Sequence, residues 1–542
     1  MNKLFVSTFI LFIFSSDFIS AQSQFCKTLG STKDDYGSSI IITKDKGYAV
    51  GGGSVSPIAV TDGEDAYLAK LDSNFNLQWT KTIRHIDITD PGTQMFFLSQ
   101  DNRGQYLTIG YLNNGSTGPF SKIYVTKVDS NGILMWNKVI DARFGLALGL
   151  SYGTSGVVTS DGGNLITGFT LNTNTGSHDS DIPLIKLDSS GNLEWSKIIG
   201  ARGNGNDDEA QTIIETLDGG VALGGSTRSF GSGSWDFYLV KLDSSFNIQW
   251  TRTIGGANDE RARSLIKTYD GGYAMTGNTY SYSAGGSDIY VVKLDSLGNL
   301  QWTRSVGGVN DEFAYSIIQT NDGGYVVVGT TLSYGAGGYD AYIVKLDSNG
   351  SLVWTKTIGG TDDDDARSIV QLQDRSFLIT GQTNYVFGNG SGDILIAKLD
   401  SIGNGCCSVG SGGSVDSGGV VSTGGTIDTL SYSIMSDVSI GTRGTLSTNC
   451  VTAIDELPGA NAQIKPFVSN DILHLVFESF LPGKYFINIV NILGQQVVED
   501  HRNISNSLPV EFQYTISSYN PGIYFASVWS ESTHMNCRVF IK

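Results

Sequence analysis

Short alternations of apolar and polar residues recur along most of the chain, and glycine- or aspartate-containing turns separate them. In the stretch 314–358 this pattern predicts four strands, at 316–320, 325–331, 340–347 and 352–358. Asp322-Gly323-Gly324 joins the first two strands, because glycine readily takes the positive φ of a tight hairpin turn. No segment of the stretch keeps a 3.6-residue apolar period over ten positions, so we expect few helices.

Two motifs repeat seven times and divide the chain into units. Lys-Leu/Val-Asp-Ser recurs every 52 to 59 residues, with its aspartate at Asp72, Asp129, Asp188, Asp243, Asp295, Asp347 and Asp400. The second motif begins with an aspartate and has its clearest form in Asp322-Gly323-Gly324-Tyr325. Four antiparallel strands in a unit of this length are typical of a β-propeller blade. The sequence therefore predicts an all-β protein with a seven-bladed propeller, and the units resemble the propeller repeats of secreted bacterial proteins over residues 24–405.

The seventh unit lacks a fourth strand, and the beginning of the chain contains a matching segment. Residues 24–30 resemble residues 353–359, with Phe25 at the position of Trp354. We therefore expect residues 24–29 to form the outer strand of the seventh blade, paired with 393–400. Such pairing joins the last blade to the first and leaves no open edge between them.

Six units carry a tryptophan seven residues after the Lys-Leu/Val-Asp-Ser aspartate: Trp79, Trp136, Trp195, Trp250, Trp302 and Trp354. One interpretation is that each ring packs between neighbouring blades, as a large aromatic side chain can. The other is a resemblance to the docking motif of quinoprotein propellers, some of which also carry vicinal cysteines like Cys406-Cys407. Because both cysteines follow the last blade, the packing interpretation is favoured.

Acidic residues recur at the start of most units and at the start of the third strand. In a propeller both places lie on the same face. The candidate binding acids are Asp259, Glu260, Asp311, Glu312, Asp363 and Asp364. Such oxygen clusters suit Ca²⁺ among the metals, but recurrence in nearly every unit favours hydrogen bonding to loop amides. We therefore predict no cofactor and no metal site.

The glycine-rich loops on the same face carry aromatic residues, of which the candidates for ligand binding are Phe230, Trp235, Tyr282, Tyr334 and Tyr385. Aromatic rings beside Gly, Ser and Asp suit stacking on sugars, and loop packing is the alternative. The sequence contains no nucleophile elbow, zinc-protease motif or P-loop, so catalysis is not predicted. Paired carboxylates nevertheless keep a polysaccharide-degrading enzyme as the alternative function.

The two ends of the chain differ in composition from the repeats. Lys3, the apolar run 4–14 and Ser20-Ala21 predict a signal peptide over 1–21. The propeller is expected over 22–405, a flexible Gly/Ser-rich linker over 406–454 and a small β-sandwich over 455–542. No later run reaches 18 apolar residues, so no transmembrane segment is predicted.

The C-terminal module contains Leu493-Gly494-Gln495 and, further on, Pro521, Gly522 and Tyr524. These motifs resemble those of type A C-terminal sorting domains, which direct cargo through the type IX secretion system of Bacteroidetes. The resemblance implies that the secretion machinery is a partner and that the protein is secreted or displayed on the cell surface.

Charge and cysteine content narrow the expected partners. The chain has 35 Lys and Arg against 53 Asp and Glu, a net charge of −18, which disfavours binding to nucleic acid. Five cysteines leave at least one unpaired, and Cys450 is expected to pair with Cys406 or Cys407. The function predicted from the sequence is binding of a glycan or a surface protein by an exported propeller.

Overall fold

The computed structural model describes residues 24–30, 33–55, 64–85, 92–113, 121–143, 149–172, 179–200, 206–384 and 392–405, and then a series of strands between 408 and 541. Every regular element in this described part is a β-strand, as predicted. None of the described residues belongs to a helix long and apolar enough to cross a membrane.

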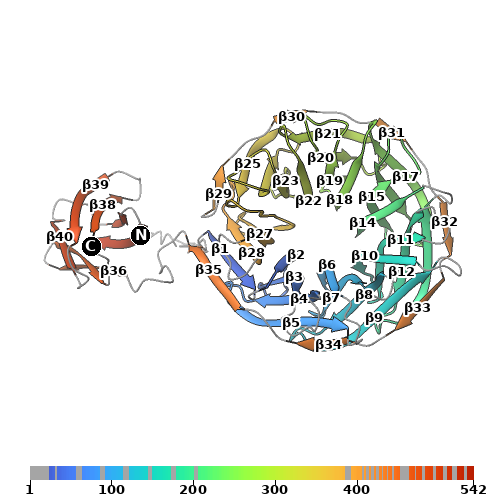
Figure 1. Cartoon of the computed structure of the whole chain (residues 1–542), viewed down its shortest axis with the longest axis horizontal. Helices are drawn as coiled ribbons and strands as arrows, with labels where there is room; N and C mark the ends of the chain where they lie inside the picture. The colour runs from blue at the N-terminus through green and yellow to red at the C-terminus, as the bar shows by residue number, and fades with distance from the viewer. Residues whose placement is uncertain are drawn as a thin grey trace, which may run out of the picture.

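Seven sheets are arranged around a common axis, which confirms the seven-bladed propeller (Figure 1). Blades one to three are β2 (Asp35–Ile42), β3 (Tyr48–Val55), β4 (Glu64–Leu71), β5 (Leu77–His85); β6 (Thr93–Gln100), β7 (Tyr106–Asn113), β8 (Ser121–Val128), β9 (Leu134–Arg143); and β10 (Gly149–Val158), β11 (Asn164–Asn172), β12 (Asp179–Leu187), β13 (Leu193–Gly200). Blades four to six are β14 (Asp208–Glu215), β15 (Val221–Thr227), β16 (Asp236–Leu242), β17 (Ile248–Gly255); β18 (Glu260–Lys267), β19 (Tyr273–Thr279), β20 (Asp288–Leu294), β21 (Leu300–Gly307); and β22 (Glu312–Gln319), β23 (Tyr325–Thr331), β24 (Asp340–Leu346), β25 (Leu352–Ile358). Blade seven contains β26 (Ser368–Gln371), β27 (Phe377–Thr383), β28 (Asp393–Leu399) and, from the start of the chain, β1 (Phe25–Gly30).

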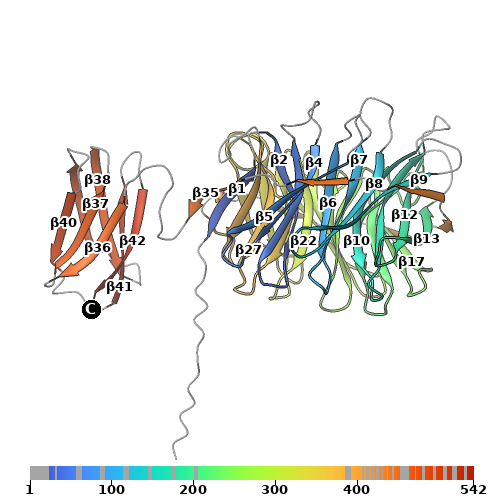
Figure 2. The same ribbon diagram turned by 90° about the horizontal axis from the view of Figure 1, so that it is seen from below.

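In blades one to six the four strands run in sequence order from the axis outward, and in blade seven the order is β26, β27, β28, β1. Figure 1 shows β2, β6, β10, β14, β18 and β22, the first strands of blades one to six, nearest the axis, and Figure 2 shows the ring from its side. The first strands of neighbouring blades contact one another around the whole ring. Their exposed positions therefore line the axis of the propeller.

The seventh blade is closed by the N-terminal strand, which confirms the expected pairing. Strand β1 runs antiparallel to β28, with Phe25 opposite Lys398 and Leu29 opposite Ile394. Phe25 packs edge-on against Phe75 of blade one, at 4.6 Å between ring centroids. The first described strand therefore ties the last blade to the first through both backbone pairing and ring packing.

The hydrophobic core lies between blades. One cluster joins Leu239 and Ile254 of blade four to Leu265 and Tyr290 of blade five, with Trp250 against it. The Trp250 ring lies 5.8 Å from that of Tyr273. It also packs against the next blade's turn, because a Cβ added at Gly298, whose φ is +77°, would lie 2.9 Å from it. The repeated tryptophan at this position is thus an inter-blade packing residue.

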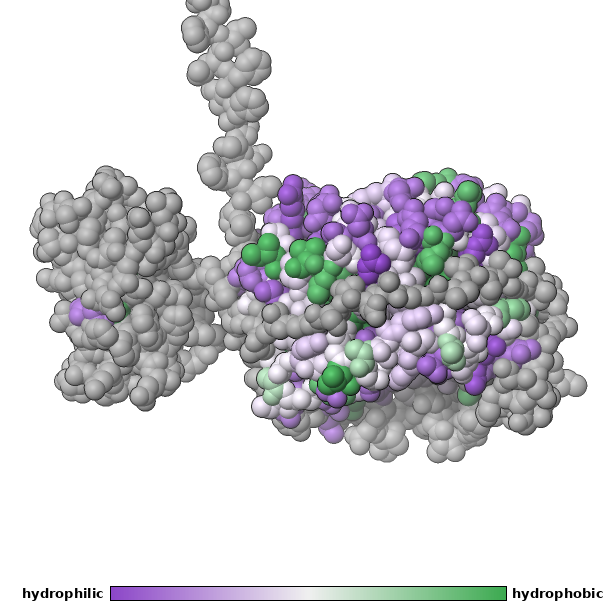
Figure 3. All heavy atoms as spheres, turned by 90° about the horizontal axis from the view of Figure 1, so that it is seen from above, coloured by the Kyte–Doolittle hydropathy of each residue, from purple (hydrophilic) through white to green (hydrophobic). Residues whose placement is uncertain are grey.

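The flank of the ring shows no broad apolar surface among the described residues drawn in Figure 3. Hydrophilic residues gather along one rim, and hydrophobic ones form small separate patches. Scattered apolar residues of this kind are normal on soluble proteins. The two axial faces are therefore better candidates for a binding site than this flank.

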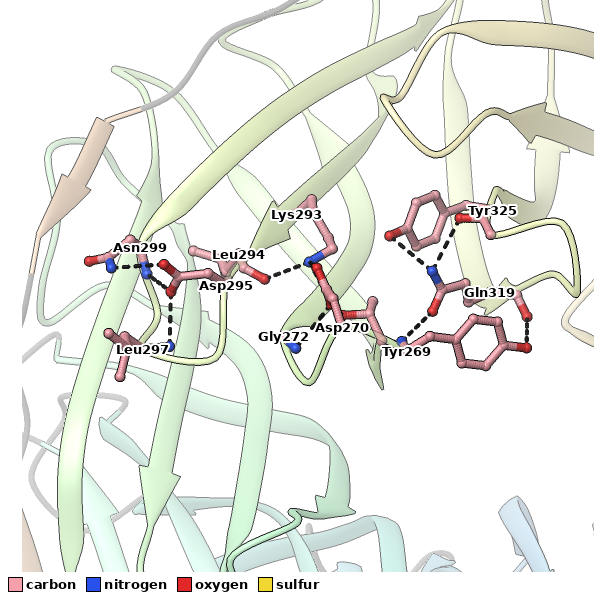
Figure 4. A network of polar contacts seen from close by, with 12 residues as sticks. Tyr269, Asp270, Gly272, Lys293, Leu294, Asp295, Leu297, Asn299, Gln319 and Tyr325 are labelled. Atoms are coloured by element: carbon pink, nitrogen blue, oxygen red, sulfur yellow. Dashed lines mark hydrogen bonds and ion pairs between the residues drawn. The ribbon is translucent and has the colours of Figure 1, made fainter.

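The two repeated motifs meet in an ion pair whose lysine is buried (Figure 4). Lys293 donates to the Asp270 carboxylate at 2.8 Å and to the Leu294 carbonyl at 2.9 Å. Asp295 accepts hydrogen bonds from the turn amides of Leu297 and Asn299 at 2.9 and 2.8 Å. Equivalent pairs occur in every blade at 2.8 to 3.0 Å: Lys70–Asp45, Lys127–Asp101, Lys186–Asp161, Lys241–Asp218, Lys345–Asp322 and Lys398–Asp374. Both motifs recur because in each blade the lysine of one motif forms an ion pair with the aspartate of the other.

The expectation of a flexible linker after the propeller is wrong for most of that segment. Seven short strands follow: β29 (Ser408–Gly410), β30 (Ser414–Asp416), β31 (Val420–Ser422), β32 (Thr426–Thr429), β33 (Ser431–Met435), β34 (Val438–Gly441) and β35 (Thr445–Val451). Each adds to the outer strand of one blade, so every blade is a five-stranded sheet. Unpaired edge strands offer free backbone groups, and these groups bind the Gly/Ser-rich segment.

The C-terminal module consists of two sheets, as the predicted sandwich requires. One has the order β36 (Gln463–Ser469), β37 (Ile472–Glu478), β40 (Val510–Thr515). The other has the order β39 (Gln496–Ile504), β38 (Gly483–Asn491), β41 (Gly522–Trp529), β42 (His534–Ile541). Gly522 and Tyr524 lie on β41, whereas Leu493, Gly494, Gln495 and Pro521 lie outside the described residues.

Candidate ligand-binding site at the mouth of the ring

The second acid of each predicted pair holds a loop. Glu260 is buried, and its two oxygens accept hydrogen bonds from the Gly256 amide at 2.6 Å and the Ser281 amide at 3.1 Å. Glu312 makes the same contacts with Gly308 and Ser333 in the next blade. These carboxylates therefore hold the loops by accepting hydrogen bonds from backbone amides, in agreement with the interpretation favoured from their recurrence.

The acids that begin the third strands are buried beside them. Asp288 accepts a hydrogen bond from the Ala284 amide at 3.1 Å. Burial, with a further contribution from the neighbouring Glu312 charge, raises the pKa of Asp288 to about 6. Glycine is required between such pairs, because a Cβ at Gly307 would lie 2.2 Å from Asp288 and 2.5 Å from Glu312.

The first acids of the pairs also contact loop backbone. Asp311 accepts from the Ser287 amide at 2.7 Å, and Asp363 from the Tyr339 amide at 2.8 Å. The carbonyl of Asp259 accepts from Tyr280 at 2.9 Å. Among the described residues no three His, Cys, Asp or Glu side chains are grouped so that they could hold a metal ion.

Most of the candidate aromatic residues pack within their own loops. The hydroxyls of Tyr282 and Tyr334 donate to the carbonyls of Gly255 and Gly307, each at 3.0 Å. Phe230 lies against the Tyr238 ring at 5.7 Å. Tyr385 lies outside the described residues.

Trp235 differs from these residues because arginines cover it. It is 5% exposed, and the Arg261 guanidinium lies 3.4 Å from its ring centroid. Arg261 also lies 3.5 Å from Glu209, across the boundary between blades four and five. Burial raises the pKa of Glu209, although the nearby arginines oppose this effect. The Trp235 ring thus packs beneath the charged pair formed by Arg261 and Glu209.

The innermost strands carry positions that change from blade to blade. The residue after the second acid position is Tyr36, Gln94, Tyr152, Glu209, Arg261, Phe313 and Asp365 in blades one to seven. The residue two places later is Ser38, Phe96, Thr154, Gln211, Arg263, Tyr315 and Arg367. A ligand site on a symmetric ring has to break the symmetry, so these axial positions are the better candidates. Sequence reasoning missed them because it looked for residues that recur.

A cavity of about 360 Å³ lies between blades six and seven on this face. Its lining combines aromatic side chains with carboxylates and amides: Phe313, Tyr315, Thr330, Tyr339, Asp363, Asp364, Asp365, Gln382 and Asn384. Asp363 and Asp364 are the predicted site residues that line it. The other lining residues come from inner strands and from the loop preceding β24.

Charges in this cavity are partly balanced. Asp365 lies 2.6 Å from Arg367, whose guanidinium lies 4.8 Å from the centre of the Tyr36 ring. Burial outweighs the hydrogen bonds from Thr383 and Gly360 and raises the pKa of Asp364 to about 6. The cavity therefore contains a carboxyl group able to donate or accept a proton near neutral pH.

A row of aromatic residues lies on blades two and three. Consecutive ring centroids are 5.5 Å apart for Phe96 and Tyr111, 4.7 Å for Tyr111 and Tyr152, and 4.7 Å for Tyr152 and Phe169. Tyr111 also donates to the side-chain oxygen of Gln94 at 2.8 Å. Of these rings, Phe96 is the most open to solvent, at 39% exposed.

A larger cavity, of about 1070 Å³, opens on the opposite face of blades two to four. Its polar lining includes Asp101 and Asp161, which are already paired with Lys127 and Lys186. Because these groups belong to the repeated ion pairs, they form part of the scaffold. The smaller cavity is the better candidate site.

Comparison with known protein families finds a match in each of the two modules. The family described as secretion system C-terminal sorting domain matches residues 466–542, and a β-propeller domain of unknown function, DUF5122, matches residues 320–352. The chain is a β-propeller protein with a type IX C-terminal sorting domain. The sorting domain indicates export by type IX secretion and a secreted or cell-surface location.

One relative is the regulatory protein FlaEY of Caulobacter vibrioides, 26% identical over 187 residues, which are 29% of this chain and 20% of the relative. The chain thus matches only about a fifth of that protein's length. Among solved structures, PorZ, titled an essential surface component of the type IX secretion system of Porphyromonas gingivalis, is 10% identical with a TM-score of 0.26, over 94% of this chain and 74% of that one. β-1,2-Mannobiose phosphorylase from Listeria innocua is 10% identical with a TM-score of 0.25, over 56% and 88%. Scores this low carry no argument about function.

Proposed function

We propose that this exported propeller binds a glycan in the cavity between blades six and seven. The observation that carries the proposal is the convergence of Phe313, Tyr315 and Tyr339 with Gln382 and Asn384 in one cavity. Aromatic rings suit the apolar faces of sugars, and amide side chains suit their hydroxyls. The cavity volume, about 360 Å³, is at the lower end of the usual range for small-ligand sites.

The charge balance favours an uncharged sugar. Arg367 forms an ion pair with Asp365, which lines the cavity, so the charge of this carboxylate is balanced. Asp363 remains an exposed acceptor at the rim. The whole chain carries a net charge of −18, which disfavours anionic ligands.

A glycan array on the purified full-length protein tests the proposal, with Tyr339→Ala as the site variant. We expect the best glycan to bind at least about fivefold more weakly to the variant, because truncation of a central aromatic contact costs more than about 1 kcal/mol. Tyr269→Ala is the matched control, since Tyr269 is 69% exposed at a turn on the opposite face. Equal binding by both variants, or binding only to a surface protein, would contradict the proposal.

A polysaccharide-degrading enzyme is the second candidate, because the pKa of Asp364 is raised to about 6 within the same cavity. A raised pKa suits a general acid in glycoside hydrolysis. Release of reducing ends from the bound glycan separates the two functions. Release that disappears in Asp364→Asn supports the enzyme, whereas binding without release supports the binding module.

A further inference from the structure

Strands β29 to β35, which lie between residues 408 and 451, form a belt around the outer edge of the ring (Figure 1). In chain order they pair with β25, β21, β17, β13, β9, β5 and β1. The belt therefore begins on blade six, passes back through blades five to one and ends on blade seven. It covers the outer edge of every blade once.

The first four belt strands begin at a regular interval, and each pairs with a different blade. Strands β29 to β32 begin at residues 408, 414, 420 and 426, and Gly-Gly pairs at 412–413, 418–419 and 424–425 precede the last three. Six extended residues span about 20 Å, and these belt strands begin at intervals of six residues.

The end of the belt meets the beginning of the propeller. Strand β1 lies between β28 and β35, and Cys26 is directly opposite Cys450 in the register of β1 with β35. Cys26 is 1% exposed and forms a disulfide. Directly opposed residues of antiparallel strands have Cα atoms about 4.5–5.5 Å apart, which is within the range that a disulfide spans.

We infer that Cys450 is the disulfide partner of Cys26 and that this bond closes the propeller covalently through its belt. The bond would replace the pairing of Cys450 with Cys406 or Cys407 expected from the sequence. It joins positions 424 residues apart, since 450 − 26 = 424, and this loop contains all seven blades. Separation of β1 from β28, where the ring closes, would then leave the two ends of the ring joined covalently through the belt.

Formation of this bond depends on an oxidising compartment. The two thiols lose two protons and two electrons, which a disulfide-containing oxidant accepts as it is reduced to a dithiol. Such oxidants operate outside the bacterial cytosol, where an exported protein folds. The ring is therefore locked only after the chain leaves the cytosol and after the belt has reached blade seven.

Peptide mapping of the full-length protein without reductant tests the connection. We expect the peptide that contains Cys26 to be linked to the peptide that contains Cys450 and to be released by dithiothreitol. A link from Cys450 to Cys406 or Cys407, or a link from Cys26 to any other cysteine, would overturn the inference.

Thermal unfolding tests the lock itself. Oxidised wild-type protein should melt several degrees above the reduced protein, and Cys450→Ser should melt at the reduced temperature with or without dithiothreitol. Cys537→Ser, in the sorting domain, is the matched control and should keep the redox difference. If Cys450→Ser cannot be purified, comparison of the oxidised and reduced wild-type proteins still tests the inference. Equal melting temperatures of these two forms would contradict covalent closure of the ring.

Discussion

Lys293 lies 2.8 Å from Asp270, and this ion pair joins the two motifs by which the blades are recognised. The lysine is 4% exposed, whereas the aspartate is about half exposed, at 51%. The buried ammonium group therefore depends on a partner at the surface. This arrangement explains why both motifs recur in all seven blades although the paired residues lie 23 to 26 positions apart in the chain.

Replacing Asp270 with asparagine should destabilise the propeller by about 1–3 kcal/mol, because a buried ammonium group loses its charged partner. Chemical denaturation of wild type, Asp270→Asn, Lys293→Met and the double variant measures this effect. The double variant should be more stable than Asp270→Asn, since no charge is then left buried. Additive losses in the two single variants would contradict the coupling.

The same ion pair predicts loss of stability in acid. Burial alone would raise the pKa of Asp270, but hydrogen bonds from Lys293 and Thr268 lower it to about 2. Because the folded-state pKa is below the unfolded value of about 4, the stabilisation is present above pH 4 and is lost as the pH falls towards 2. Denaturation midpoints measured from pH 6 to pH 2 should fall less in Asp270→Asn than in wild type.

Asp364 predicts the opposite pH dependence. Its folded-state pKa is raised to about 6, so its contribution is largest below pH 4 and is lost as the pH rises from about 4 to about 6. Asp364→Asn should therefore gain stability relative to wild type between pH 4 and pH 8, by an amount on the order of 2 kcal/mol. The exposed Asp362→Asn is the control and should show no such gain; an unchanged difference for Asp364→Asn would contradict the prediction.

The fold could be predicted from the sequence because its determinants recur. Seven copies of the Lys293 and Asp270 positions indicate seven blades, and the similarity of residues 24–30 to 353–359 indicates how the ring closes. Recurrence also explains why the candidate acids are poor markers of function. Glu260 and Glu312 are repeated because each holds a loop.

The cavity and the belt lay beyond sequence reasoning for different physical reasons. Phe313, Tyr315 and Gln382 line the cavity at positions where the blades differ, so no motif marks them. The belt binds through backbone groups, so its Gly/Ser-rich sequence resembles a linker. The six-residue spacing of its Gly-Gly pairs was the available signal, and it becomes meaningful only beside seven open sheet edges.

Removal of residues 455–542 should prevent appearance of the protein outside the outer membrane, because the sorting domain matched over 466–542 is lost. Cell fractionation and immunoblotting measure this outcome. Tyr269→Ala in the intact chain should be exported normally and controls for damage to the propeller. Normal amounts of the truncated chain in the medium would contradict the prediction.

Removal of residues 22–30 should lower the melting temperature of the whole propeller, since β1 lies between β28 and β35. Its loss separates blade seven from both the belt and the packing of Phe25 against Phe75. Phe25→Ala alone should cost about 3–5 kcal/mol, because Phe25 is 5% exposed and its removal leaves a cavity. Phe96→Ala, at 39% exposed, is the matched control and should cost much less. Because neighbouring blades share their cores, the shortened chain should still unfold in one transition; separate melting of a single blade, or an unchanged melting temperature, would contradict ring closure by β1.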